Sequence, residues 1–205
     1  MIRDTFYDII GFAWPTIVIF LTIVIIMRFA YLFSNKKEFV FYKEIFLLLF
    51  LGYSLLLFEL VTEKDVNIPS GTNFIPFTEI FRYEFGSKLF LQQVIGNIIL
   101  FIPFGYFATY YIKAKKPLNI LIVVLLSSGV IETVQYFIGR SFDIDDIILN
   151  TIGGLIGFLI YRVLDAVRKV LPSFFQRELF YNILTFVLLV LAILYFLNFF
   201  SVGGL

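Results

Sequence analysis

The sequence of 205 residues contains no cysteine and no histidine, and only 15% of its residues carry a charge. The two missing residue types exclude disulfides, thiol chemistry, zinc sites built on cysteine or histidine, and nucleophiles activated by a histidine. The net charge of +1 is too small for the broad positive field of a nucleic-acid-binding protein, so we expect no nucleic acid partner. Any chemistry must use carboxylates, amides, hydroxyls, lysine or arginine.

The sequence has a large excess of apolar residues for its length. Hydrophobic residues make up 60% of the chain and aromatic residues 20%, and the mean hydropathy is +0.97. A soluble domain is typically about 45–50% apolar and about 25% charged, and a chain of this size cannot bury such an excess in its own core. The composition therefore predicts an integral membrane protein surrounded by membrane lipids.

Long runs with almost no charged residues define the expected membrane spans. A bilayer-crossing helix needs about 20 mostly apolar residues, and six runs approach or reach this length: 9–27, 45–61, 89–112, 118–138, 147–161 and 179–202. None shows the two-residue alternation of a membrane β-strand. The first run is too long for a signal-peptide core and lacks a small-residue cleavage site, so we expect it to be retained.

These runs predict an all-α, polytopic helical bundle of about six transmembrane helices. No linker or repeat divides the chain, so we expect a single membrane domain over residues 1–205. Gly153 and Gly157 are four residues apart on one face of the fifth expected helix. Small residues at this spacing favour close contact with a neighbouring helix.

The distribution of lysine and arginine predicts the orientation in the membrane. With six spans, one side receives only five of the 16 cations, namely Arg3, Lys64, Arg82, Lys88 and Arg140. Because cytoplasmic loops carry the excess of positive charge, the opposite side should be cytoplasmic. The loops at 62–88 and 139–146 should then face outward.

Three of the expected spans carry a polar residue at a similar depth. At a rise of 1.5 Å per residue, Asn97, Glu132 and Asn150 lie roughly 9–12 Å inside the outer ends of their helices. Gln135 follows Glu132 by three residues and Asn150 follows Asp146 by four, so each pair shares a helix face. Polar groups in hydrocarbon are costly and mark candidate functional sites. The spacing predicts one outward-facing polar pocket, with interhelical hydrogen bonding or another structural role as the alternative.

The second outer loop concentrates charge beside this pocket. Arg140 is its only cation and is followed by Asp143, Asp145 and Asp146, so we expect a bidentate ion pair between Arg140 and one carboxylate. Asp143 and Asp146 also have the spacing of a helix N-cap followed by an acidic third position. Capping and ligand binding are compatible, and the sequence leaves both open.

The first outer loop contains a short apolar segment. Pro76 stands where a proline often begins a helix, and the apolar residues Phe77, Ile80, Phe81 and Phe85 have the spacing of one helix face. This pattern is typical of an amphipathic helix in the membrane interface. An apolar lid over the bundle is the alternative interpretation.

Several short segments, taken in order, resemble a known family. They are 73–77 (NFIPF), 97–105 (NIILFIPFG), 132–135 (ETVQ), 139–146 (GRSFDIDD) and 150–153 (NTIG). Their order and spacing resemble the VanZ-like family, which is associated with teicoplanin resistance. The resemblance covers residues 41–162 as a VanZ-like core and leaves 179–202 as an additional C-terminal transmembrane helix. It implies a multi-pass protein of the bacterial cytoplasmic membrane, and it implies no particular reaction.

Our leading hypothesis is a binding protein of the cell envelope. Its pocket would engage an amphiphile, either a lipoglycopeptide or a lipid-linked cell-wall precursor, without a cofactor or a metal ion. The expected ligand-binding residues are Asn73, Asn97, Glu132, Gln135, Arg140, Asp143, Asp146 and Asn150.

The alternative hypothesis is an intramembrane enzyme that modifies a lipid-linked substrate. Glu132 or Asp146 would serve as general base, and Asp143, Asp145 and Asp146 would hold a hard cation. A transporter is a third interpretation, because the Pro-x-Gly sequence at 103–105 suggests an interrupted helix. The sequence leaves open whether the protein is an enzyme.

Overall fold

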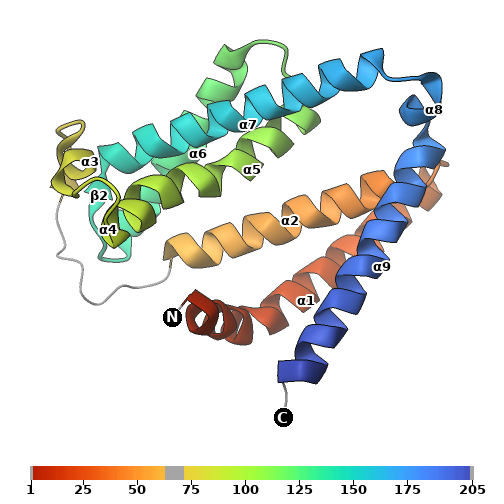
Figure 1. The fold of residues 1–205 in the computed structure, drawn as a ribbon, viewed down its shortest axis with the longest axis horizontal. Helices are drawn as coiled ribbons and strands as arrows, with labels where there is room; N and C mark the ends of the chain where they lie inside the picture. The colour runs from red at the N-terminus through yellow and green to blue at the C-terminus, as the bar shows by residue number, and fades with distance from the viewer. Residues whose placement is uncertain (1, 63–71, 204–205) are drawn as a thin grey trace. The chain divides into compact units, whose positions relative to one another are not determined.

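The structure, a computed structural model, describes residues 2–62 and 72–203. In these ranges the chain is helical apart from short connections and one pair of two-residue strands (Figure 1). The elements in chain order are α1 (Ile2–Ser34), α2 (Phe41–Thr62), β1 (Thr72–Asn73), α3 (Thr78–Arg82), α4 (Lys88–Phe90), the π-helical turn η1 (Leu91–Ile95), α5 (Gly96–Ile112), α6 (Pro117–Phe137), β2 (Phe142–Asp143), α7 (Ile144–Val170), α8 (Ser173–Gln176) and α9 (Glu178–Gly203). The predicted all-α class is confirmed.

Long apolar helices account for most of the expected spans. Within the described residues, the segments long and apolar enough to cross a membrane are Phe41–Val61, Lys88–Ile112, Pro117–Phe137, Ile144–Val170 and Glu178–Tyr195. A shorter apolar helix, Val18–Ser34, lies in α1. For the first and last expected runs, the side chains up to residue 14, at residue 17 and beyond residue 195 lie outside the described residues. The chain is a multi-pass helical membrane protein.

Two helices differ from the expectations. The fifth run, 147–161, was expected to begin at the aspartates before it, and α7 does begin there, at Ile144, directly after its capping residue; however, the helix continues well beyond 161, through charged turns, to Val170. The helix α5 continues without a break through Pro103 and Gly105. The prediction of an interrupted helix at 103–105, on which the transporter interpretation was based, is therefore wrong.

Contacts between residues divide the chain into two compact units. The first comprises Met1–Ala13 and Ser54–Asp165, and the second comprises Trp14–Tyr53 and Ala166–Leu205. All the site residues predicted from the sequence belong to the first unit.

Charged contacts join the helices of the second unit. The guanidinium of Arg28 in α1 donates to both oxygens of Glu44 in α2, at 2.7 and 3.0 Å. Lys43 of α2 pairs with Glu178 of α9 at 2.5 Å. A cavity of about 200 Å³, lined mainly by apolar side chains of α1 and α2, lies beside the first of these pairs.

Glycines bring α5 and α7 into backbone contact in the first unit. A Cβ atom added to Gly105 would lie 2.0 Å from the carbonyl oxygen of Gly154, and one added to Gly157 would lie 2.1 Å from that of Ile102. A Cβ atom at Gly153 would also meet the α5 backbone, at 2.2 Å. The close packing predicted for Gly153 and Gly157 is confirmed, and it fixes α7 against α5.

Two short strands join the segment before α3 to the start of α7. They pair in parallel, with Thr72 of β1 opposite Phe142 of β2 and Asn73 opposite Asp143. Figure 1 shows α3, α4 and β2 gathered at the same end of α5 and α7. This end of the first unit holds the candidate site.

Candidate functional site

Six polar side chains gather around the start of α7. They are Asn97 of α5, Glu132 of α6, Arg140 and Asp143 of the connection to α7, and Asp145 and Asp146 of its first turn. We call them the polar cluster. Two of its carboxylates, those of Glu132 and Asp145, are almost fully buried, each only 1% exposed. A buried carboxylate is costly unless it has hydrogen-bonding partners. Glu132 and Asp145 each accept hydrogen bonds from backbone N–H groups.

The carboxylate of Glu132 holds the connection between α6 and α7. Its Oε2 accepts a hydrogen bond from the backbone N–H of Asp143 at 2.9 Å. Glu132 also lies close enough to Asp146, Asp143 and Arg140 for their charges to interact. A carboxylate of one membrane span therefore contacts the residue that begins the next.

Asp143 caps α7. Its Oδ1 accepts hydrogen bonds from the N–H of Asp145 and from the side-chain amide of Asn73, both at 2.9 Å. The first bond confirms the capping interpretation, and the second connects the cap to β1. Burial raises the pKa of the Asp143 carboxyl above its usual value, an effect that these two hydrogen bonds oppose.

Asp146 connects α7 to α5 and to the connection before α7. Its Oδ1 accepts a hydrogen bond from Nδ2 of Asn97 at 2.5 Å. The Arg140 guanidinium is close enough to interact with the carboxylates of both Asp146 and Glu132. The structure thus brings Asn97, Glu132, Arg140 and Asp146 together.

Gln135 and Arg140 share one backbone acceptor. Nε2 of Gln135 donates to the carbonyl oxygen of Val61 at 2.9 Å, and Nη1 of Arg140 donates to the same oxygen at 3.1 Å. Val61 stands near the end of α2, where helix carbonyls lack intrahelical partners. Both side chains therefore help to end α2 beside the polar cluster.

Asn150 lies one turn further along α7 and contacts a different partner. Its Nδ2 donates to the hydroxyl of Ser128 in α6 at 2.9 Å, and both residues are buried. This contact matches the alternative interpretation of Asn150 as an interhelical hydrogen-bonding residue.

Asp145 is a member of the cluster that was not among the expected ligand-binding residues. Its carboxylate accepts backbone N–H bonds from Phe77, Glu79 and Ile80, at 2.5, 2.7 and 3.2 Å. Phe77 lies in the left-handed region, with φ of 70°, which bulky residues rarely adopt. Asp145 thus holds the turn into α3. No local pattern could reveal this role, because its donors are 65–68 residues away in the chain.

The helix α3 and the residue that follows it, Tyr83, add three polar residues to this region that the sequence analysis missed. Nη1 of Arg82 lies 3.1 Å from both carboxylate oxygens of Glu79, and the Tyr83 hydroxyl donates to Glu79 at 3.4 Å. Burial, and next the Glu79 carboxylate, raise the pKa of Tyr83, and Asp146 acts in the same direction. Tyr83 and Glu79 therefore lie near the polar cluster.

The three aspartates do not form the cation site considered from the sequence. Among the described residues, no group of three acidic side chains converges as metal ligands would. Asp145 is occupied by backbone N–H groups, and Asp143 caps α7 and receives Asn73. The arrangement offers carboxylate, amide and guanidinium groups, which suit recognition of a polar group by hydrogen bonds and charge.

The fold and the cluster define a class: a multi-pass helical membrane protein with charged side chains gathered at the ends of its spans. A sequence profile described as VanZ/LLP1 matches residues 16–168, which is most of the chain. The protein belongs to this family. The helix α9 lies outside the matched region.

A curated relative and the solved structures give further comparisons. The chain is 34% identical over 91 residues to Protein VanZ of Enterococcus faecium. The aligned part is 43% of this chain and 51% of the relative, so the match spans about half the length of that relative. No solved structure matches the chain.

Proposed function

We propose that this protein binds the polar part of an amphiphile at the polar cluster, in the outer leaflet of a bacterial cytoplasmic membrane. The amphiphile is a lipoglycopeptide of the teicoplanin type or a lipid-linked cell-wall precursor. Binding it would lower the effect of such antibiotics on the cell wall. Membership of the VanZ/LLP1 family supports the setting, and the positions of the charged side chains support the site.

The observation that carries the proposal is the meeting of Glu132, Asp146 and Arg140. The two carboxylates come from different membrane spans, and the guanidinium comes from the connection between them. Ionisable groups within spans are costly and are rarely retained without a use. Simple helix association would need only small residues and amides, which α5, α6 and α7 already provide elsewhere.

The cluster offers complementary groups to a polar ligand. Arg140 would pair with an anionic group, such as a carboxylate or phosphate. Glu132 and Asp146 would accept hydrogen bonds from hydroxyl, amide or amine groups, and Asn97 would orient them. Lipoglycopeptides and lipid-linked precursors both carry anionic groups together with hydroxyl or amide donors.

The surroundings of the cluster favour an amphiphile over a soluble ligand. The helices α5, α6 and α7 expose apolar side chains, including Ile99, Leu126 and Ile152. An acyl or prenyl chain could lie along these surfaces while its polar end enters the cluster. Burial of that chain would supply about 0.8 kcal/mol for each methylene group.

The enzyme hypothesis uses the same two carboxylates, with one of them as general base. Glu132 and Asp146 accept hydrogen bonds from Asp143 and Asn97 respectively. A general base must in addition reach a proton of the substrate. Turnover of a labelled lipid-linked precursor that is lost in Asp146→Asn would favour the enzyme hypothesis.

Resistance measurements test this proposal. Wild type and variants are expressed at equal levels in a susceptible bacterium, and inhibitory concentrations are measured for teicoplanin and for a glycopeptide without an acyl chain. Expression of the wild-type protein should raise the inhibitory concentration of teicoplanin several-fold and that of the glycopeptide without an acyl chain by less. Glu132→Gln and Arg140→Ala should lose most of this protection.

Matched controls come from charged residues of the second unit. Glu38→Gln and Arg177→Ala remove the same charges at exposed positions of this unit, so both should protect like wild type. Full protection by the two cluster variants, or no protection by wild type, would contradict the proposal.

A further inference from the structure

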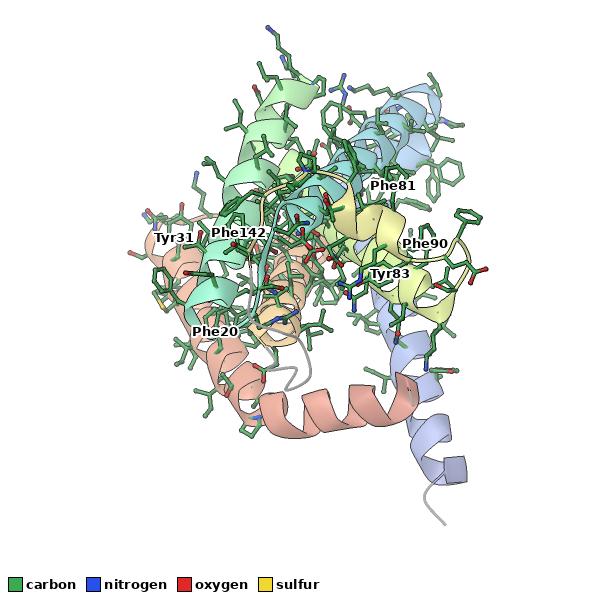
Figure 2. All side chains as sticks on the ribbon, turned by 90° about the vertical axis from the view of Figure 1, so that its left-hand side faces the viewer. Phe20, Tyr31, Phe81, Tyr83, Phe90 and Phe142 are labelled. Atoms are coloured by element: carbon green, nitrogen blue, oxygen red, sulfur yellow. The ribbon has the colours of Figure 1, made fainter. Side chains whose placement is uncertain are left out.

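The segment from Phe74 to Phe85 exposes a continuous set of large apolar side chains. We call Phe74, Ile75, Phe77, Phe81 and Phe85 the aromatic wedge. Their exposed fractions run from 51% for Phe77 to 88% for Phe85. Figure 2 shows Phe81 and Tyr83 on this segment and Phe90 in the helix that follows it. Exposed apolar patches of this kind mark contact surfaces.

The wedge has a fixed position relative to two membrane spans. Asp145, in the first turn of the span Ile144–Val170, accepts the N–H groups of Phe77 and Glu79. At its other end the wedge is followed directly by the span Lys88–Ile112, and Phe85 packs on Phe90 in that span with ring centroids 5.0 Å apart. The wedge therefore lies at the level where these spans leave the hydrocarbon.

The two sides of the segment differ in polarity. Its inner side faces the polar cluster through Glu79 and Tyr83, and Asn73 donates to Asp143. Its outer side carries the aromatic rings. Arg82, whose side chain is 68% exposed, pairs with Glu79. This combination matches the chemistry of the bilayer interface, in which apolar rings enter the acyl region and polar groups stay at the headgroups.

We propose that the aromatic wedge inserts into the lipid of the bilayer interface beside the polar cluster. The occupant of this surface is membrane lipid, because the surface is continuous with two spans and lies at their ends. The wedge would keep α3 at headgroup depth, so that the polar cluster opens toward the lipid. This inference concerns the contact with lipid alone and stands whether or not the cluster binds an amphiphile.

Site-specific tryptophans test the insertion. The single tryptophan, Trp14, is replaced by phenylalanine, and one reporter is then introduced at a time, as Phe81→Trp or Phe85→Trp. Leu126→Trp, at an exposed position in the span Pro117–Phe137, serves as the lipid control. Lys115→Trp, in the exposed connection between α5 and α6, serves as the water control. Each full-length variant is reconstituted in vesicles with phospholipids brominated at a shallow or a deep acyl position.

The expected result is strong quenching of the two wedge reporters by shallow bromine, weaker quenching by deep bromine and little quenching by aqueous iodide. Leu126→Trp should respond more to deep bromine, and Lys115→Trp to iodide. Quenching of the wedge reporters by iodide alone would overturn the inference by placing the wedge in water. Protection from all quenchers would also overturn it, because the wedge would then be covered by protein. Neither result depends on ligand binding or resistance.

Discussion

The buried carboxylate of Glu132 accepts the backbone N–H of Asp143 at 2.9 Å. Asp143 in turn accepts hydrogen bonds from the N–H of Asp145 and the amide of Asn73. These bonds connect α6, the start of α7 and the strand before α3. The position of the cap of α7 therefore depends on a carboxylate within the neighbouring span.

This relationship predicts different effects for two substitutions of Glu132. In Glu132→Gln the side-chain oxygen can still accept the Asp143 N–H, so stability should remain close to wild type. In Glu132→Ala the N–H loses its buried acceptor, which costs about 1–3 kcal/mol. Thermal unfolding in detergent should show a clearly lower Tm for alanine only, by about 2–4 °C per kcal/mol. Equal Tm values for wild type and Glu132→Ala would contradict the role assigned to this bond.

Asp145 should control the order of α3. Its carboxylate accepts three backbone N–H groups, and hydrogen bonds to charged groups contribute about 1.5–3 kcal/mol each. In Asp145→Ala, amide hydrogen exchange at Phe77, Glu79 and Ile80 should become at least tenfold faster. Asp165→Ala, in the later part of the same helix, is the control and should leave these rates unchanged. Unchanged exchange in Asp145→Ala would show that other contacts hold α3.

The contact between α5 and α7 should not tolerate a methyl group. In Gly105→Ala the new Cβ would lie 2.0 Å from the Gly154 carbonyl oxygen, so the helices must separate, at a cost of about 1–3 kcal/mol. Gly129→Ala in α6 is the matched control, because no atom lies within 4 Å of its added Cβ. We expect a lower Tm for the first variant and an equal or higher Tm for the second. A Tm for Gly105→Ala that is higher than that for Gly129→Ala would argue against the backbone contact between α5 and α7.

The pKa shift of Asp143 predicts a pH dependence of stability. Burial raises the pKa of this carboxyl in the folded protein, so the folded state disfavours its ionised form. The resulting destabilisation is present above the raised pKa and disappears as the pH falls toward about 3.9, the value in an unfolded chain. Asparagine at this position can still cap α7 but does not ionise.

Tm measurements of wild type and Asp143→Asn check this prediction. The Tm of the variant minus that of wild type should be more positive at pH 7 than at about pH 4, close to the pKa of the unfolded chain. A difference that stays constant, or that grows as the pH falls, would contradict the direction of the shift.

Much of the fold follows from local sequence properties. Runs of apolar residues predict the spans because lipid forces the backbone to satisfy its hydrogen bonds within a helix. Helical spacing also predicts that Asn97, Glu132 and Asn150 lie at a similar depth in their spans, and that Asp146 shares a helix face with Asn150. The N-cap role of Asp143 is readable because its donor, Asp145, is two residues away.

The rest depends on contacts between distant parts of the chain. Asp145 caps α3 through residues 65–68 positions away, and Glu79 and Tyr83 approach the cluster only because that cap places α3 there. The partner of Asn150 is Ser128 of α6, which the shared face with Asp146 does not predict. Local periodicity contains no information about these partners.

Binding to purified protein tests the central claim, that the polar cluster holds the polar part of an amphiphile. Fluorescent teicoplanin and a labelled lipid-linked precursor are titrated against the full-length protein in nanodiscs, with Arg140→Ala compared to Arg177→Ala. We expect at least one of the two compounds to bind wild type and Arg177→Ala with the same Kd, and to bind Arg140→Ala at least tenfold more weakly. Equal affinity of Arg140→Ala and wild type, or no binding of either compound to wild type, would contradict the claim.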